Sequence, residues 1–288
     1  MKVSVIGLGA MGAGMAGNLQ RVGLLSFGWN RTRERGEAAA ERFGFHLANS
    51  LQEAAGSADL VITSVSADED LLEVSAQLAS VMQAGNIVLD TSTVSSWTAQ
   101  QVAERLQAHG IHFLDAPVSG GREGAEQGTL VMMVGGDAAI LKQICPVLEA
   151  ISSKVVHMGD VGAGQAAKAV NQIMAAGINQ AVTDALAFGS CQGLDMDKVI
   201  DVIQSGAADN WFLRHRGRSM CEGRFEPGFR IALHHKDLRI CEDMLGEDML
   251  GEQSSELVSR TLQHYQQLMD AGYGDEDISA LYRLKRSD

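Results

Sequence analysis

A lysine and an asparagine stand together in a stretch of small residues that is typical of a helix. Gly164, Lys168 and Asn171 recur at helical spacing, so a helix would place them on one face. Their neighbours are mostly alanine and valine, which would let a ligand approach the backbone. The pair is therefore a candidate ligand site. The alternative is that the aliphatic part of Lys168 packs against an apolar surface while its ammonium group stays in solvent.

A second candidate follows the apolar run at 111–116. There the chain reads Asp115-Ala116-Pro117-Val118-Ser119-Gly120-Gly121. The Ser119 hydroxyl and the backbone N–H groups around Gly120 and Gly121 could form an anion nest at a strand end, where open α/β sheets place ligands. An ordinary Ser-Gly-Gly turn is the alternative. Lys236-Asp237, taken alone, is typical of a surface ion pair.

The start of the chain carries a glycine-rich turn between the apolar strand predicted at 3–6 and a helical pattern at 13–19. The turn reads Gly7-Leu8-Gly9-Ala10-Met11-Gly12. In this context Gly7 permits the tight turn, Gly9 lets the backbone approach a pyrophosphate, and Gly12 lets helix and strand pack closely. The helix N-terminus would add unpaired N–H groups for the phosphates. These six residues are predicted to bind a dinucleotide.

The next strand, predicted at 24–29, indicates which dinucleotide. It ends in Asn30-Arg31-Thr32, without the acid that would hold the ribose hydroxyls of NAD. Arg31 can bind a 2′-phosphate through bidentate hydrogen bonds, and the Thr32 hydroxyl can donate another. This ending predicts NADP(H) in preference to NAD(H). The alternative is that Arg31 is a solvated surface charge, like its neighbours Arg33 and Arg35.

Elements of two kinds position these residues. Strand patterns alternate with helical stretches such as 96–108, and they occur at 58–65, 86–90, 111–116, 129–134 and 155–158. This alternation predicts a doubly wound, mostly parallel α/β sheet of the Rossmann type over residues 1–162. From residue 163 the strand signal ends. We expect one long connecting helix at 163–190 and an all-helical domain over 163–288.

Composition narrows the class of protein. The 288 residues carry a formal net charge of -13, which disfavours nucleic acid and membrane surfaces as partners. No apolar run is long enough to span a membrane, and a strand pattern directly after Met1-Lys2 leaves no room for a secretory leader, so a cytoplasmic protein is expected. The four cysteines lack metal-ligand spacing and are expected to be reduced, mostly buried thiols. No metal is predicted.

As an ordered set, these motifs resemble the β-hydroxyacid dehydrogenase family. That group includes 3-hydroxyisobutyrate dehydrogenase, tartronate semialdehyde reductase and the glyoxylate and succinic semialdehyde reductases. The matching segments run along nearly the whole chain: 7–19, Asp90-Thr91-Ser92-Thr93, 115–121, 164–171, Phe229 with Lys236-Asp237, and the tail at 271–277.

The resemblance implies hydride transfer between a nicotinamide and a small carboxylate-bearing substrate. Lys168 would be the general acid or base, and Asn171 would orient the substrate or Lys168. Ser119, Gly120 and Gly121 would hold the substrate carboxylate, and Asp237 and Phe229 would line the pocket. Thr93 would lie between the nicotinamide and the substrate. Lys236 would reach the cofactor or the carboxylate, and Val65 and Ser66 would lie against the cofactor. The family usually has Leu-Pro in place of Val65-Ser66. It also implies a homodimer or homotetramer.

The ending Asn30-Arg31-Thr32 resembles the NADPH-preferring branch, which favours a glyoxylate or succinic semialdehyde reductase. The alternatives are a 3-hydroxyisobutyrate or tartronate semialdehyde enzyme, an imine reductase, a decarboxylating enzyme like 6-phosphogluconate dehydrogenase, and a non-catalytic NADPH-binding protein. Lys168 disfavours the imine reductase, and the retained Lys168, Ser119 and Asn171 disfavour the non-catalytic protein. The segment 207–212 does not decide the substrate. One departure is the repeated Glu-Asp-Met-Leu-Gly at 242–252, which leaves the helix boundaries there open.

Overall fold

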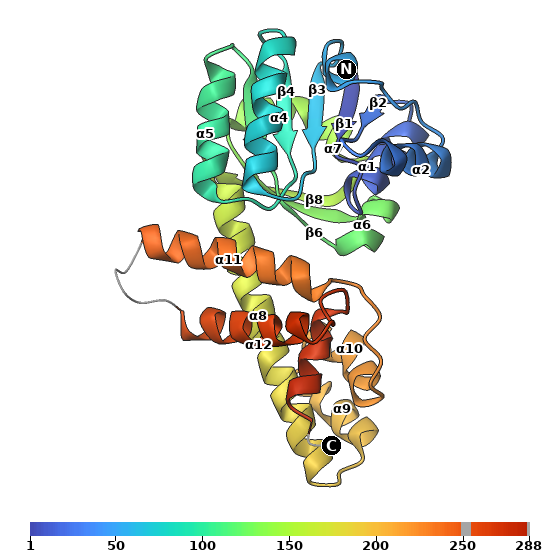
Figure 1. The fold of residues 1–288 in the computed structure, drawn as a ribbon, viewed down its shortest axis with the longest axis vertical. Coiled ribbons are helices and arrows are strands. Elements are labelled where there is room, and N and C mark those ends of the chain that lie inside the picture. The colour runs from blue at the N-terminus through green and yellow to red at the C-terminus, as the bar shows by residue number, and fades with distance from the viewer. Residues whose placement is uncertain (249–254, 287–288) are drawn as a thin grey trace. The chain divides into compact units, whose positions relative to one another are not determined.

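The chain forms two compact units, Met1–Lys168 and Ala169–Asp288. The structure is a computed structural model, and it describes residues 1–248 and 255–286 (Figure 1). The division falls after Lys168, inside a long helix, whereas the composition changes at Gly162. Each unit has its own apolar core.

The first unit is built on an eight-stranded sheet with the order β2-β1-β3-β4-β5-β7-β6 and β8 beside β7. The strands are β1 (Val3–Ile6), β2 (Leu25–Trp29), β3 (Leu60–Thr63), β4 (Ile87–Asp90), β5 (His112–Asp115), β6 (Val118–Ser119), β7 (Leu130–Gly135) and β8 (Ser152–Gly159). From β2 to β5 every pair is parallel. The predicted doubly wound sheet is thus confirmed. Strand β7 runs antiparallel to β5 and β6, and parallel to β8.

Helices cover both faces of this sheet, because alternate strand residues point to opposite sides. In β3, Leu60 and Ile62 join the core formed with α1, α2, α6 and α7, and Val61 joins the core formed with α3, α4 and α5 (Figure 1). The helices are α1 (Gly12–Arg21), α2 (Arg33–Phe43), α3 (Leu51–Ala55), α4 (Asp68–Val81), α5 (Ser96–Gln107), α6 (Gly121–Gln127) and α7 (Ala138–Leu148). This packing leaves the carboxyl ends of the parallel strands to carry the candidate site.

The second unit is helical, as the sequence predicts. Helix α8 (Ala163–Cys191) begins in the first unit and continues as the first element of the second. It is followed by α9 (Met196–Ile203), α10 (Trp211–Cys221), α11 (Ile231–Asp248), α12 (Glu256–Asp270) and the 3-10 helix η1 (Ile278–Leu284). Helices α11 and α12 pack against each other (Figure 1), and their core includes the fully buried Leu238 and Tyr265.

Two details qualify the sequence analysis. The first copy of the repeat lies inside α11, and residues 249–252 of the second copy lie outside the described residues. All four cysteines are free, but the expectation that they are mostly buried is wrong: Cys241 is buried, Cys145 and Cys221 are half-buried, and Cys191 is exposed.

In the described parts of the chain, no helix is long and apolar enough to cross a membrane.

Candidate active site

The glycine-rich turn is tight at two of its glycines and open at the third. Gly7 has a φ of +92°, and a Cβ there would lie 2.1 Å from the Ser64 carbonyl oxygen. A Cβ at Gly12 would lie 1.9 Å from the carbonyl oxygen of Gly7, so both positions need glycine. At Gly9 a Cβ would meet nothing within 4 Å. The turn is therefore tight on its inner side and open at Gly9, where a phosphate could approach the backbone.

Asn30 holds this turn against the end of β2. Its Oδ1 accepts a hydrogen bond from the Leu8 N–H at 2.9 Å, and its Nδ2 donates to the Thr32 carbonyl oxygen at 2.7 Å. Both ends of the amide are thus engaged by the backbone. Asn30 positions the turn and the start of α2, a role that we did not predict from the sequence. Thr32 is the residue that precedes α2.

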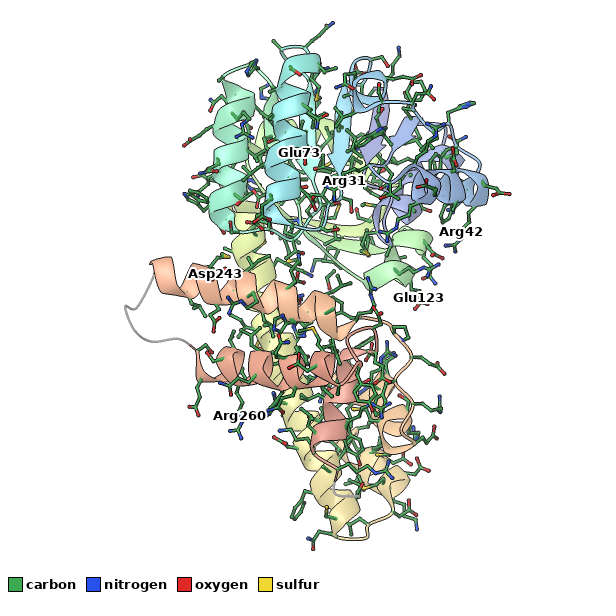
Figure 2. All side chains as sticks on the ribbon, viewed as in Figure 1. Arg31, Arg42, Glu73, Glu123, Asp243 and Arg260 are labelled. Atoms are coloured by element: carbon green, nitrogen blue, oxygen red, sulfur yellow. The ribbon has the colours of Figure 1, made fainter. Side chains whose placement is uncertain are left out.

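Arg31 extends from the same loop to the first turn of α4. Its Nη1 lies 2.6 Å from Asp70 Oδ1 and 3.9 Å from Glu73 Oε2. The Arg31 side chain is 70% exposed, and Asp70 is the more buried partner at 21%. Figure 2 labels Arg31 and Glu73, which come from the end of β2 and from α4. The predicted cation is present at the strand tip, with carboxylates beside it.

Buried hydrogen bonds fix the ends of β3 and β4. Asp90 Oδ1 accepts hydrogen bonds from Thr63 Oγ1 at 2.6 Å and from Ser92 Oγ at 2.7 Å, and Ser92 Oγ accepts one from the Val65 N–H. Burial raises the pKa of Asp90 from 3.8 to about 6, against the opposing effect of these bonds. The network shapes the loops that carry Val65, the exposed Ser66 and the half-buried Thr93.

Helix α8 begins on the carboxylate of Asp115, at the end of β5. Asp115 accepts the backbone N–H of Gly162 at 2.8 Å and that of Gln165 at 2.9 Å. Burial raises the pKa of Asp115, and the two N–H bonds oppose this rise. A carboxylate at this place satisfies helix N–H groups that have no partner within the helix. Asp115 thereby fixes where the first turns of α8 lie.

Gln165 joins α8 to the loop that carries Thr93. Its Oε1 accepts a hydrogen bond from the Val94 N–H at 3.2 Å, and its Nε2 donates to the Ser92 carbonyl oxygen at 2.9 Å. The side chain is 1% exposed. Gln165 thus holds the backbone on both sides of Thr93.

Lys168 lies on the same face of α8, one turn further on. Its side chain is 7% exposed, and Nζ donates a hydrogen bond to the Val118 carbonyl oxygen at 2.9 Å. Ser119 follows directly, and Gly120 and Gly121 have φ values of +130° and +61°, which favour glycine. The structure therefore brings the lysine to the Ser-Gly-Gly segment. The amine is bonded to the residue before Ser119, and Gly120 and Gly121 are exposed. An amine, a serine hydroxyl and backbone N–H groups are the kinds of group that can bind a carboxylate and exchange a proton.

In the second unit, a chain of hydrogen bonds joins Asn171 to the Lys236-Asp237 pair. Gln172 Nε2 donates to Asp237 Oδ2 at 2.6 Å, and Gln172 Oε1 accepts from Asn171 Nδ2 at 2.9 Å. Lys236 Nζ lies 3.0 Å from Asp237 Oδ1. Because a carboxylate only accepts hydrogen bonds, Asp237 fixes the Gln172 amide, and Gln172 in turn fixes which end of the Asn171 amide faces it. The ion pair has one buried and one partly exposed member, because Asp237 is 5% exposed and the Lys236 side chain is 31% exposed.

Phe229 is held by the tail that the sequence analysis compared with the family. Asp277 Oδ2 accepts the backbone N–H groups of Gly228 and Phe229 at 3.0 and 2.9 Å. The Phe229 ring lies 5.2 Å from that of the buried His234, whose Nε2 donates to the Gln172 carbonyl oxygen at 3.2 Å. The half-buried Phe229 and the buried Gln172 therefore both contact His234 in the second unit.

The predicted residues fall into two groups. The first unit carries those near the strand ends: the turn at 7–12, Asn30 to Thr32, Val65, Ser66, Thr93, Ser119 to Gly121, and Lys168. The second carries Asn171, Phe229, Lys236 and Asp237. The sequence analysis missed the positioning roles of Asp115, Gln165 and Gln172. The sequence features that could have indicated these roles are a polar residue at a strand end, for Asp115, and polar residues within a helix of small residues, for Gln165 and Gln172. Among residues 1–248 and 255–286, no cluster of His, Cys, Asp and Glu could hold a metal ion.

Comparison with known proteins gives the family. Residues 2–159 match the model of the NAD-binding domain of 6-phosphogluconate dehydrogenase, and residues 162–285 match the NAD-binding model of NADP-dependent 3-hydroxyisobutyrate dehydrogenase. An uncharacterised oxidoreductase of Shewanella frigidimarina is 41% identical, over 84% of each chain. An NAD-dependent L-serine dehydrogenase of Pseudomonas aeruginosa is 31% identical over 98% of this chain and 97% of its own.

A solved structure agrees along the whole chain. The 3-hydroxyisobutyrate dehydrogenase of Mycobacterium tuberculosis, determined with L-serine, matches with a TM-score of 0.91 and 32% identity over 99% of both chains. The glycine-rich turn, the parallel sheet and the helical second unit thus occur in a chain whose relatives are dehydrogenases. The protein belongs to the β-hydroxyacid dehydrogenase family of NAD(P)-dependent enzymes.

Proposed function

We propose that the protein is an NADP(H)-dependent reductase of small aldehyde or keto acids, of the glyoxylate and succinic semialdehyde type. The observation that carries the proposal is the buried amine of Lys168 at the start of the Ser-Gly-Gly segment, bonded to the Val118 carbonyl at 2.9 Å. This arrangement puts a proton donor beside a place for a carboxylate. A small acid with a reducible carbonyl needs both.

The residues of the first unit fit a dinucleotide. The open face of Gly9 leaves room for the pyrophosphate, and the loops after β3 and β4 would carry Val65, Ser66 and Thr93 to the nicotinamide end. Asn30, Arg31 and Thr32 would meet the adenosine ribose, and Lys236 would contact the cofactor. When bound, the nicotinamide supplies the hydride.

Lys168 would donate the proton that the substrate oxygen needs as the carbonyl is reduced, and would take it back in oxidation. Its bond to a backbone carbonyl holds the amine in place without neutralising its charge. The Ser119 hydroxyl and the N–H groups of Gly120 and Gly121 would bind the substrate carboxylate. Asn171 would orient the substrate or Lys168, and Phe229 and Asp237 would line the pocket.

The preference for NADP(H) is supported by the residues at the tip of β2. Arg31 stands where an acid would select NAD(H), and a guanidinium can bond a phosphate through two N–H groups. A hydrogen bond to a charged group contributes about 1.5–3 kcal/mol, which is enough to set a preference. Asp70 and Glu73, which lie close to Arg31, weaken this advantage.

A second candidate is a 3-hydroxyisobutyrate or tartronate semialdehyde enzyme. The similarity along the whole chain to the Mycobacterium tuberculosis 3-hydroxyisobutyrate dehydrogenase favours it. Both candidates use the same carboxylate site and the same lysine. They differ in what joins the carboxylate to the reacting carbon: a direct bond in glyoxylate, an unbranched chain in succinic semialdehyde, and a carbon with a methyl or hydroxyl group in the substrates of the second candidate.

The test is oxidation of NADPH by the purified protein, followed by absorbance, with glyoxylate, succinic semialdehyde, tartronate semialdehyde and methylmalonate semialdehyde in turn. Each assay is repeated with NADH. Fast turnover of glyoxylate or succinic semialdehyde with NADPH supports the proposal. Turnover of only the branched or hydroxylated semialdehydes favours the second candidate. Tight NADPH binding with no turnover of any of the four acids would overturn both.

A further inference from the structure

We propose that Asp70 limits how strongly this enzyme prefers NADP(H), because its carboxylate competes with the 2′-phosphate for the guanidinium of Arg31. The inference rests on the proposed function, which assigns Arg31 to that phosphate. It adds a specificity-determining residue on α4, away from the loop after β2 in which the sequence places cofactor selection.

The geometry distinguishes a fixed partner from a movable one. Arg31 Nη1 lies 2.6 Å from Asp70 Oδ1, and the arginine side chain is 70% exposed whereas the aspartate is 21% exposed. Asp70 lies in the first turn of α4, where the helix dipole favours a carboxylate. The carboxylate is therefore held by its own helix. The guanidinium, on a long exposed side chain, is the group that can turn to another anion.

The neighbouring charges decide what this means for a phosphate. Glu73 Oε2 lies 3.9 Å from the same Nη1, so two carboxylates lie within 4 Å of the cation. A 2′-phosphate that reaches Arg31 must share the guanidinium with Asp70 or displace that carboxylate. With NAD(H), which lacks the phosphate, Arg31 keeps its pair with Asp70. The preference for NADP(H) is then set by the difference in free energy between the Arg31–phosphate pair and the Arg31–Asp70 pair.

The expected effect of Asp70→Asn follows from this competition. An exposed ion pair is worth up to about 1 kcal/mol, so removing the carboxylate tightens NADP+ binding by roughly three- to fivefold. The Kd of NAD+ changes by less than about twofold, because NAD+ does not compete for Arg31. Glu69→Gln is the matched control. It removes the same charge from the same turn of α4, and no ion pair among the described residues joins Glu69 to Arg31.

The experiment measures the Kd values of NADP+ and NAD+ by titration calorimetry on the full chain. The proteins compared are the wild type, Asp70→Asn, Glu69→Gln, Arg31→Ala and the double variant Arg31→Ala/Asp70→Asn. The expected result is tighter NADP+ binding in Asp70→Asn, with Glu69→Gln close to the wild type. In the Arg31→Ala background the Asp70 substitution should have almost no effect, because the contested cation is gone.

Three results would overturn the competition. They are unchanged NADP+ affinity in Asp70→Asn, weaker NADP+ affinity there, or a full effect of Asp70→Asn without Arg31, which would indicate direct repulsion of the phosphate. The proposed cofactor preference fails separately, if Arg31→Ala leaves the affinity for NADP+ unchanged. The two proposals can thus be told apart within one set of proteins.

Discussion

The ammonium of Lys168 donates a hydrogen bond to the backbone carbonyl of Val118 at 2.9 Å, directly before Ser119. The contact joins α8 to the short strand β6, which are distant in sequence. Asp115 supports the same arrangement, since it accepts N–H groups from the first turn of α8. The Lys168 side chain is therefore held at its ammonium by the Val118 carbonyl and at its base by the anchored start of α8. A proton donor of fixed geometry needs such support.

Replacing Lys168 tests its chemical role. We expect Lys168→Ala to lower kcat by roughly a hundred- to ten-thousandfold, the usual contribution of a general acid, while the Kd of NADPH changes little. Single-turnover kinetics with the best substrate of the panel measures the chemical step. Lys142→Ala, which removes an exposed lysine of α7, serves as the control and should keep full activity. Turnover near the wild-type rate in Lys168→Ala would assign the proton to another group.

Features set by neighbouring residues could be predicted from the sequence, because strand patterns, helix patterns and glycine turns depend on short stretches of chain. The turn at 7–12, the parallel strands and α8 are of this kind. The antiparallel direction of β7 could not be predicted, because Leu130–Gly135 would have the same pattern in either direction. Asn30 is predicted as a cofactor ligand, and its bonds to the backbone of Leu8 and Thr32 are a further role that the sequence did not indicate. Such side-chain-to-backbone bonds depend on how distant segments meet.

Gln165 illustrates the same limit and gives a second prediction. Its amide bonds the backbone on both sides of Thr93 through one donor and one acceptor. We expect Gln165→Leu to lower the free energy of unfolding by about 1–3 kcal/mol, because buried backbone groups lose their partners. It should also lower kcat/KM, since the Thr93 loop is no longer held.

Gln165→Glu separates the two bonds, because an ionised carboxylate can accept from Val94 but cannot donate to Ser92. Urea unfolding and steady-state kinetics of both variants measure the effects. Stability and kinetics equal to the wild type in Gln165→Leu would remove Gln165 from the positioning of this loop.

The two glycines Gly7 and Gly9 should respond in opposite ways to alanine. A Cβ at Gly7 would lie 2.1 Å from the Ser64 carbonyl oxygen, on a backbone with φ of +92°, so Gly7→Ala should destabilise the fold by about 2 kcal/mol or more. A Cβ at Gly9 meets nothing within 4 Å, so Gly9→Ala should keep its thermal midpoint. It should instead weaken NADPH binding at least about tenfold, since the methyl group occupies the approach of the pyrophosphate.

Thermal melts and cofactor titrations of the two variants check this contrast. Gly23→Ala is a useful control, because Gly23 also has a positive φ, of +74°, but no atom within 4 Å of its Cβ position. It reports the cost of backbone conformation without the clash. Undiminished NADPH affinity in Gly9→Ala would place the pyrophosphate elsewhere.

The buried carboxyl group of Asp90 predicts a specific dependence of stability on pH. Its pKa is raised from 3.8 to about 6, mainly by burial. Between these two pH values the carboxyl group is therefore protonated in the folded protein and ionised in the unfolded chain. Ionised Asp90 therefore destabilises the fold. This penalty is complete above about pH 6 and disappears as the pH falls towards 3.8, a difference of about 3 kcal/mol.

Asp90→Asn removes the titration while keeping the hydrogen bonds. Thr63 and Ser92 both donate to Oδ1, which an asparagine retains, and Asp90 Oδ2 has no partner among the described residues. As the pH falls from about 6 to about 4, the free energy of unfolding of the wild type, measured in urea, should thus rise relative to that of Asp90→Asn, because only the wild type loses the ionisation penalty. Asp243→Asn, an exposed carboxylate on α11 (Figure 2), controls for the loss of surface charge. A difference between wild type and Asp90→Asn that stays constant over this interval would show that Asp90 ionises alike in the folded and unfolded chains, and that its burial is offset by its bonds to Thr63 and Ser92.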